Sequence, residues 1–116
     1  MKYVIDIDGT ICTNTEGNYA EALPHRDRIE MINLLYNKGH RIVYFTARGM
    51  GTSGEDVSSA NLMWYEFTKN QLRSWNAKYH DLIVGKPSAD YYVDDRMIGI
   101  SDFFQITGGL KNEHKR

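Results

Sequence analysis

Two aspartates separated by a single residue, Asp6 and Asp8, close the first apolar run of the chain. If that run is a β-strand, residues i and i+2 point the same way, so both carboxylates project together from its carboxyl end. Two neighbouring carboxylates can share nucleophilic and acid–base work. The pair alone is weak evidence, because short acidic pairs also occur on solvated turns.

Three later signals follow the same pattern along the chain. Thr46 closes a second apolar run, Lys86 comes shortly after a third, and Asp94 and Asp95 end a fourth. The carboxyl ends of parallel strands meet at one edge of a sheet, where α/β proteins place their sites. Each signal alone has a structural explanation, such as a surface lysine, a turn or a helix cap. Their order favours one shared site.

These residue types supply what phosphoryl transfer requires. Asp6 can attack phosphorus and form an aspartyl phosphate, which splits one displacement into two easier steps. Asp8 can protonate the leaving oxygen and then activate water. Thr46 can donate its hydroxyl proton to a phosphate oxygen, and Lys86 can offset the phosphate charge. We therefore expect Asp6, Asp8, Thr46 and Lys86 to be the catalytic residues.

The same reasoning predicts Mg²⁺ as cofactor. A carboxylate that approaches a phosphate dianion is repelled unless a divalent cation lies between them. Asp6, Asp94 and Asp95 offer the hard oxygen ligands that Mg²⁺ prefers. No cluster of histidine and cysteine indicates zinc.

Composition limits the other classes of function. The 116 residues suit one compact domain, and the formal net charge of −1 provides no positive field for nucleic acid. A single cysteine, Cys12, excludes an intrachain disulfide, and the acidic N-terminal stretch is unlike a signal peptide. No apolar run reaches the roughly 18–20 residues that span a bilayer. We expect a cytoplasmic protein that does not bind a membrane, and the charge disfavours nucleic acid as a partner.

Apolar periodicity predicts alternating strands and helices. Ile29, Ile32 and Leu35 recur at helical spacing, and Ser53 with Asp56 has the spacing of a capping box before a second helix. Alternating elements favour an α/β fold with a parallel sheet. Trp64, Phe67 and Trp75 are expected in the core of that fold. Strands are predicted at residues 2–6, 41–45, 81–84 and 90–93, a loop or small flap at 11–25, and a last short segment at 98–104.

The four signals resemble, in order, the motifs of the haloacid dehalogenase superfamily of Mg²⁺-dependent phosphatases. Asp6 to Thr10 matches the first motif, Thr46 the second, Lys86 the third, and Asp94 with Asp95 the fourth. The resemblance implies a Rossmann-like three-layer sandwich with a central, mainly parallel sheet. It also implies the following roles. Asp6 is nucleophile and metal ligand, Asp8 is acid/base with its backbone carbonyl on the metal, Thr46 and Lys86 bind phosphate, and Asp94 with Asp95 or Asp102 completes the metal site.

The resemblance covers residues 1–104, and residues 105–116 are expected to be a flexible tail. Most members of that superfamily carry an inserted cap domain, for which this chain has no room. A capless site is open to bulky substrates or covered by a neighbouring subunit in a homo-oligomer. Residues 12–24, 46–50 and 85–90 further resemble small phosphatases of capsule and surface-polysaccharide synthesis. This resemblance implies a phosphorylated sugar or a similar small metabolite as substrate.

Thr10, Asn14 and Arg48 are the candidate substrate-binding residues. The guanidinium of Arg48 could bind a second phosphate or a carboxylate, but a salt bridge that braces its loop explains it equally well. Other functions also stay open. These are a receiver-like phospho-acceptor module, which would normally carry its acidic pair before the phosphorylated aspartate, a catalytically silent Mg²⁺-binding domain, and a nucleotide or nucleic-acid-end phosphatase.

Overall fold

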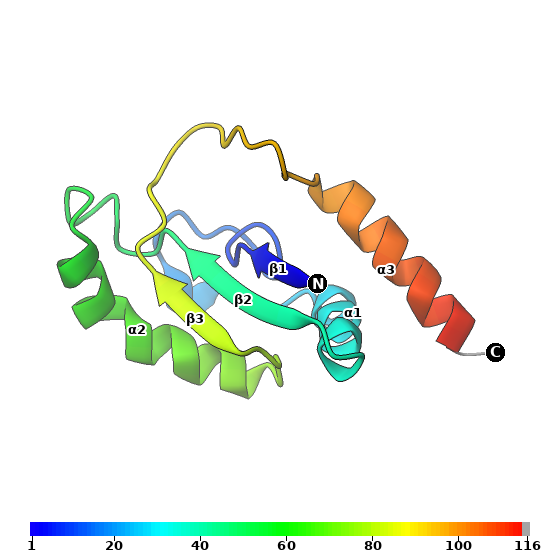
Figure 1. Ribbon diagram of the computed structural model, residues 1–116. Helices are drawn as coiled ribbons and strands as arrows, with labels where there is room; N and C mark the ends of the chain where they lie inside the picture. The colour runs from blue at the N-terminus through cyan, green and yellow to red at the C-terminus, as the bar shows by residue number, and fades with distance from the viewer. Residues whose placement is uncertain (115–116) are drawn as a thin grey trace.

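The computed structural model describes residues 1–114, and side chains within them for residues 1–107. Strands alternate with helices along the chain, as predicted (Figure 1). The elements are β1 (Lys2–Ile5), a 3-10 turn η1 (Tyr19–Glu21), α1 (Arg26–Asn37), β2 (Arg41–Thr46), α2 (Val57–Ser74), β3 (Asp81–Val84) and α3 (Ile100–His114).

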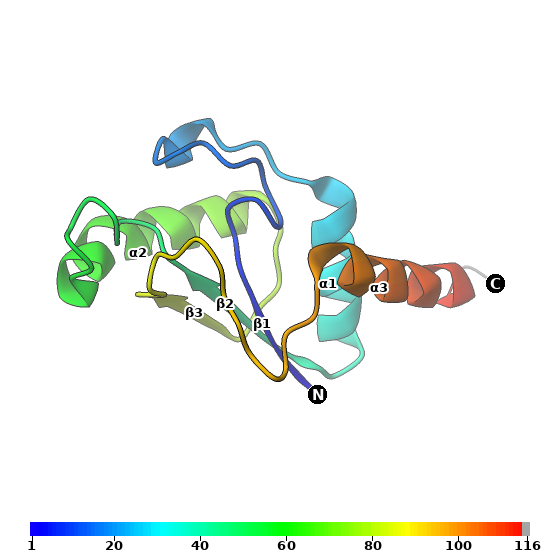
Figure 2. The ribbon, with the colours of Figure 1, turned by 90° about the horizontal axis from the view of Figure 1, so that it is seen from above.

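β1, β2 and β3 form a parallel sheet in the order β1-β2-β3. Successive right-handed crossovers in one direction place both connecting helices on the same face. Figure 2 shows α1 and α2 on one side of the strands. Ile5, Tyr44 and Leu82 are register neighbours that point to this face and join a single buried cluster. The cluster also contains Ile29, Ile32 and Leu35 of α1, and Leu72 and Trp75 at the end of α2.

Local sequence explains where the two crossover helices begin and end. α1 stops before Gly39, whose φ of +94° is the left-handed conformation that closes many helices. α2 starts three residues later than a cap at Ser53 would place it. Asp56 is the N-cap and accepts the backbone N–H of Ser58, while the Ser53 hydroxyl accepts the N–H of Asp56. Ser53 therefore stabilises the turn before the helix, and Asp56 caps the helix itself.

The stretch after β3 differs from the prediction. The sequence pattern predicts a strand at residues 90–93, but the structure has irregular chain there. Tyr91 and Val93 are almost fully exposed. Tyrosine and valine favour strands mainly because their side chains pack well on the surface of a sheet. These residues have no neighbouring strand to pair with, so they do not form one. The strand prediction is therefore wrong.

α3 packs against α1 and continues to His114 (Figure 1). It therefore crosses the boundary expected between residues 104 and 105. The predicted flexibility of the tail stays a prediction, and residues 115–116 lie outside the described chain.

The α/β class, the Rossmann-like parallel sheet and the lack of a cap within residues 1–114 are confirmed. Trp75 is in the core as expected, whereas Trp64 and Phe67 are half-buried. None of the helices described here has both the length and the apolar character needed to cross a membrane.

Two leucines of α2 test this account of the core. Leu72 is fully buried, so Leu72→Ala should lower the free energy of unfolding by about 2–5 kcal/mol through lost contacts and a cavity. Leu62 on the same helix is exposed, so Leu62→Ala should change it by less than about 0.5 kcal/mol. Urea denaturation measures both values. Similar losses from the two variants would contradict the assignment of the buried face.

Candidate active site

A pocket of about 360 Å³ lies where the first and second strands end. It gathers side chains from the turn after β1, the flap (residues 11–25), the end of β2 and the chain after β3. Six predicted site residues line it, which are Asp6, Asp8, Asn14, Thr46, Arg48 and Lys86.

The turn after β1 aims both aspartates into this pocket. Ile7 is fully buried, so its neighbours Asp6 and Asp8 point the opposite way. The chain then turns sharply, with the N–H groups of Thr10 and Ile11 donating to the carbonyl of Ile7. The turn is possible because Gly9 takes a φ of +81°, which residues with a side chain rarely adopt.

Asp6 has a cationic partner that faces the pocket. Its Oδ1 lies 3.4 Å from Lys86 Nζ, and its Oδ2 accepts a hydrogen bond from the Thr10 hydroxyl at 3.3 Å. Burial raises the pKa of Asp6 above its usual 3.8, and Lys86 opposes that rise. The sequence predicts that Thr10 binds substrate, but in this structure its hydroxyl contacts Asp6.

Lys86 lies between Asp6 and an aromatic ring. Its Nζ is 4.1 Å from the ring centroid of Tyr92, whose hydroxyl donates to the carbonyl of Pro87 at 2.6 Å. The backbone N–H of Lys86 donates to the carbonyl of Thr46, which ties the segment after β3 to the end of β2. Sequence reasoning missed Tyr92, because the pattern around it predicts a strand.

Asp8 has a different cationic partner, Arg48, which is buried. Arg48 Nε donates to Asp8 Oδ2 at 2.9 Å and Nη2 donates to Oδ1 at 3.0 Å. The Arg48 side chain is 0% exposed and that of Asp8 is 19% exposed. Of the two roles considered for Arg48, the structure has the salt bridge.

The surroundings of Arg48 are completed by Tyr19 and by two residues of α2, Thr68 and Gln71, that the sequence did not single out. Nη1 donates to Gln71 Oε1 and to the Thr68 hydroxyl on α2. Its guanidinium lies 4.7 Å from the ring centroid of Tyr19. The sequence could have indicated this contact through Thr68 and Gln71, two polar residues that lie at helical spacing beside the apolar Leu72. Leu72 is fully buried in the structure.

Thr46 and Asn14 line the pocket with polar side chains. The Thr46 hydroxyl accepts the backbone N–H of Arg48 at 3.2 Å, so its own proton is free to be donated elsewhere. Asn14 Oδ1 accepts the N–H of Glu16 at 3.2 Å, which fixes the turn that opens the flap.

The structure does not bring the late acidic residues to this pocket. Asp94, Asp95 and Asp102 are exposed and outside its lining. Asp94 accepts the backbone N–H of Arg96, and this hydrogen bond lowers the pKa of Asp94. Within the described chain no three histidine, cysteine or acidic side chains come together in a way that could hold a metal ion.

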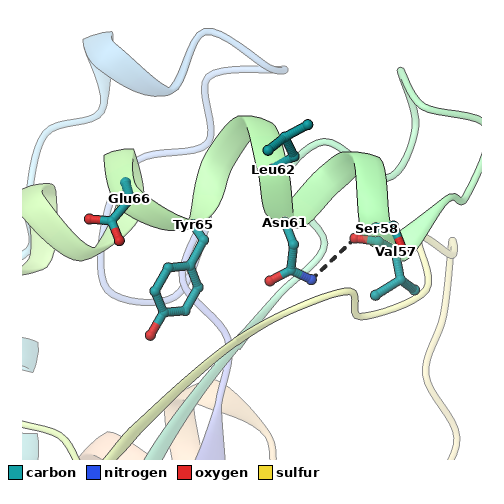
Figure 3. A pocket seen from close by; sticks show the side chains of 6 residues that line it. All are labelled: Val57, Ser58, Asn61, Leu62, Tyr65 and Glu66. Atoms are coloured by element: carbon teal, nitrogen blue, oxygen red, sulfur yellow. Dashed lines mark hydrogen bonds between the residues drawn. The ribbon is translucent and has the colours of Figure 1, made fainter.

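A second hollow, of about 600 Å³, lies on α2 (Figure 3). It is shallow and mostly apolar, and Glu66 is its only charged lining residue. It contains none of the predicted site residues, so it is not the candidate active site. Its lining consists of Val57, Ser58, Asn61, Leu62, Tyr65 and Glu66.

Comparison with solved structures places the fold. A structural-genomics target from Vibrio cholerae superposes with a TM-score of 0.82 at 28% identity, over 97% of this chain and 98% of that one. Two structures of a Pnkp1/Rnl/Hen1 complex, one described as an RNA repair complex, each match with a TM-score of 0.54 at 19% and 18% identity. These two matches cover 81% and 97% of this chain but 31% of the other chain, and show a shared fold. No protein-family model and no curated protein matches the sequence.

Replacing Lys86 tests the electrostatics of Asp6. The ammonium group favours the ionised carboxylate, so Lys86→Met should raise the pKa of Asp6 further above its already elevated value. Lys38→Met removes an exposed lysine from the end of α1 and should leave that pKa unchanged. Carboxyl ¹³C NMR titration measures each value. An Asp6 pKa that falls in Lys86→Met would contradict the contact.

Proposed function

We propose that this protein is a phosphomonoesterase that works through an aspartyl phosphate on Asp6. One observation carries the proposal, namely two carboxylates in one pocket with different cationic partners. Asp6 faces Lys86, a partially exposed cation at 3.4 Å, while Asp8 is paired with buried Arg48 at 2.9 Å. Lys86 is therefore the cation that an incoming phosphate can recruit.

In the first step, an oxygen of Asp6 attacks phosphorus. The bond between phosphorus and the leaving oxygen breaks, and that oxygen takes a proton from Asp8, which enters this step as the carboxylic acid, as the alcohol departs. Lys86 moves from the Asp6 carboxylate to the phosphoryl oxygens, where its charge offsets theirs. The Thr46 hydroxyl donates to another of those oxygens.

In the second step, water attacks phosphorus on the opposite side. Asp8, now ionised, takes a proton from that water, and the acyl phosphate bond to Asp6 breaks. Inorganic phosphate leaves and both carboxylates return to their starting states. The two steps need one nucleophile and one acid/base, which fits the unequal surroundings of Asp6 and Asp8.

We also propose Mg²⁺ as cofactor, on grounds of charge. When Asp8 carries the proton for the first step, Asp6, Lys86 and Arg48 leave one positive charge in the pocket, which does not offset the two negative charges of a phosphate dianion. A divalent cation held by Asp6 would supply the missing charge. Of the residues that the resemblance assigns to such an ion, Asp6 and Asp8 line the pocket, whereas Asp94 and Asp95 lie outside it, and no step above is assigned to the metal.

A phosphorylated sugar or a similar small metabolite is the proposed substrate class. The support is the likeness to surface-polysaccharide phosphatases and a pocket without a cap. An end-phosphorylated RNA oligonucleotide belongs in the same test, because two structures of similar fold come from a Pnkp1/Rnl/Hen1 complex, one of them described as an RNA repair complex. The net charge of −1 disfavours it.

The central test is phosphate release by wild-type protein and by Asp6→Asn. The amide keeps the size of the side chain but cannot act as the nucleophile, so release should fall at least about 10³-fold. The substrates are a panel of sugar phosphates, a nucleotide, the oligonucleotide and an aryl phosphate. Asp27→Asn, an exposed site on α1, is the matched control and should keep full activity. Equal release by wild type and Asp6→Asn would refute the nucleophile assignment.

A metal titration tests the cofactor. After treatment with a chelator, activity should fall at least about tenfold and return with Mg²⁺, because without the ion the positive charge in the pocket does not offset the negative charge of the dianion. Full activity with chelator present would refute Mg²⁺ as the cofactor.

A further inference from the structure

Arg48 is held on every polar atom of its guanidinium. Nε and Nη2 donate to Asp8, and Nη1 donates to Gln71 at 2.7 Å and to Thr68 at 3.2 Å. The side chain is 0% exposed. A buried cation in this position cannot turn to meet an anion from solvent without breaking these bonds and leaving Asp8 unpaired.

Tyr19 covers the guanidinium from the flap and ties three segments together. Its hydroxyl accepts the backbone N–H of Gly49 at 3.1 Å, and its carbonyl accepts Gln71 Nε2 at 2.8 Å. Its ring packs edge to face on Trp64 of α2. Gly49 fits there because a Cβ would strike the Trp64 ring. The flap, the loop after β2 and α2 therefore converge on Arg48.

The two oxygens of Asp8 are not equivalent in this arrangement. Oδ1 accepts Arg48 Nη2 and lies 3.6 Å from the Cys12 sulfur, whose single proton has the carbonyl of Ile7 as a second acceptor at 3.6 Å, whereas Oδ2 accepts Arg48 Nε alone. A carboxylate oxygen has two acceptor sites, so Oδ2 keeps one free. A two-pronged pair with a planar guanidinium also fixes the plane of the carboxylate.

We propose that Arg48, braced by Gln71 and Tyr19, is a positioning residue that presents Asp8 Oδ2 to the leaving-group oxygen of the substrate. This rests on the proposed function and assigns Arg48 a role other than binding substrate. Lys86 is held less firmly than Arg48. Its one contact with Asp6 is longer than the contacts of Arg48 with Asp8, and the Lys86 side chain is partly exposed. One cation moves to the phosphate, and the other keeps the acid/base in place.

The leaving group of the substrate separates this role from a merely structural one. An aryl phosphate such as p-nitrophenyl phosphate leaves without needing a proton, whereas an alkyl phosphate such as glycerol 2-phosphate needs one from Asp8. The ratio kcat/KM reports the first chemical step, in which the leaving group departs. A displaced Asp8 therefore lowers kcat/KM for the alkyl phosphate far more than for the aryl phosphate.

The experiment measures kcat/KM on both substrates for wild type, Arg48→Lys and Gln71→Ala. Arg48→Lys retains the charge but cannot form the two-pronged pair, so it should lose about 10²-fold on the alkyl phosphate and less than about fivefold on the aryl phosphate. Gln71→Ala should show the same pattern at about tenfold on the alkyl phosphate. Asn70→Ala, an exposed neighbour on α2, is the matched control and should equal wild type on both.

Comparison with Asp8→Asn completes the test. The Arg48→Lys and Asp8→Asn double variant should be no slower on the alkyl phosphate than Asp8→Asn alone, because Arg48 acts through Asp8. Equal losses on the two substrates, or additive losses in the double variant, would overturn the positioning role. If thermal denaturation shows that Arg48→Lys does not fold, Gln71→Ala tests the same role through the same pair of substrates. A wild type that releases phosphate from neither substrate and from no member of the panel above would refute the proposed function itself.

Discussion

Two negative charges held side by side in a half-buried pocket are the constraint on which this structure depends. Asp6 and Asp8 project from one turn, and burial raises the pKa of Asp6. Each carboxylate is stabilised by a cation of its own, and the two cations reach the pocket from different places. Lys86 comes from the chain after β3, and Arg48 comes from the loop after β2. The parallel order of the strands makes both approaches possible, because it brings their carboxyl ends together.

The two ion pairs are supported in different ways, and this difference gives the two carboxylates different roles. Arg48 is locked by α2 and by Tyr19 of the flap, so Asp8 is held in one orientation. Lys86 contacts the ring of Tyr92 and one oxygen of Asp6, which leaves it able to follow a phosphate. A rigid acid/base beside a nucleophile with a movable counter-charge suits a reaction in which the nucleophile gains and then loses a phosphoryl group.

Sequence alone could predict the features that depend on local pattern. The three strands, both crossover helices and the pocket residues Asp6, Asp8, Thr46 and Lys86 follow from apolar runs and what ends them. The clamp of Tyr19 and Gln71 on Arg48 could not be predicted, since it needs segments 52 residues apart to pack together. For residues 90–93 the sequence predicts a strand that the structure does not have, because no partner strand lies beside them. The late aspartates that depended on that strand are therefore not in the pocket.

The most direct test of the central claim is to find where the phosphoryl group resides during turnover. Asp8→Asn protein is mixed with an aryl phosphate, quenched in acid within milliseconds, digested and mapped by mass spectrometry. Because this variant cannot activate water, the phosphoryl group should accumulate on the peptide that contains Asp6, and Asp6→Asn should carry none. Release of phosphate by wild type together with an unmodified Asp6 peptide, or an adduct on another residue, would contradict the account.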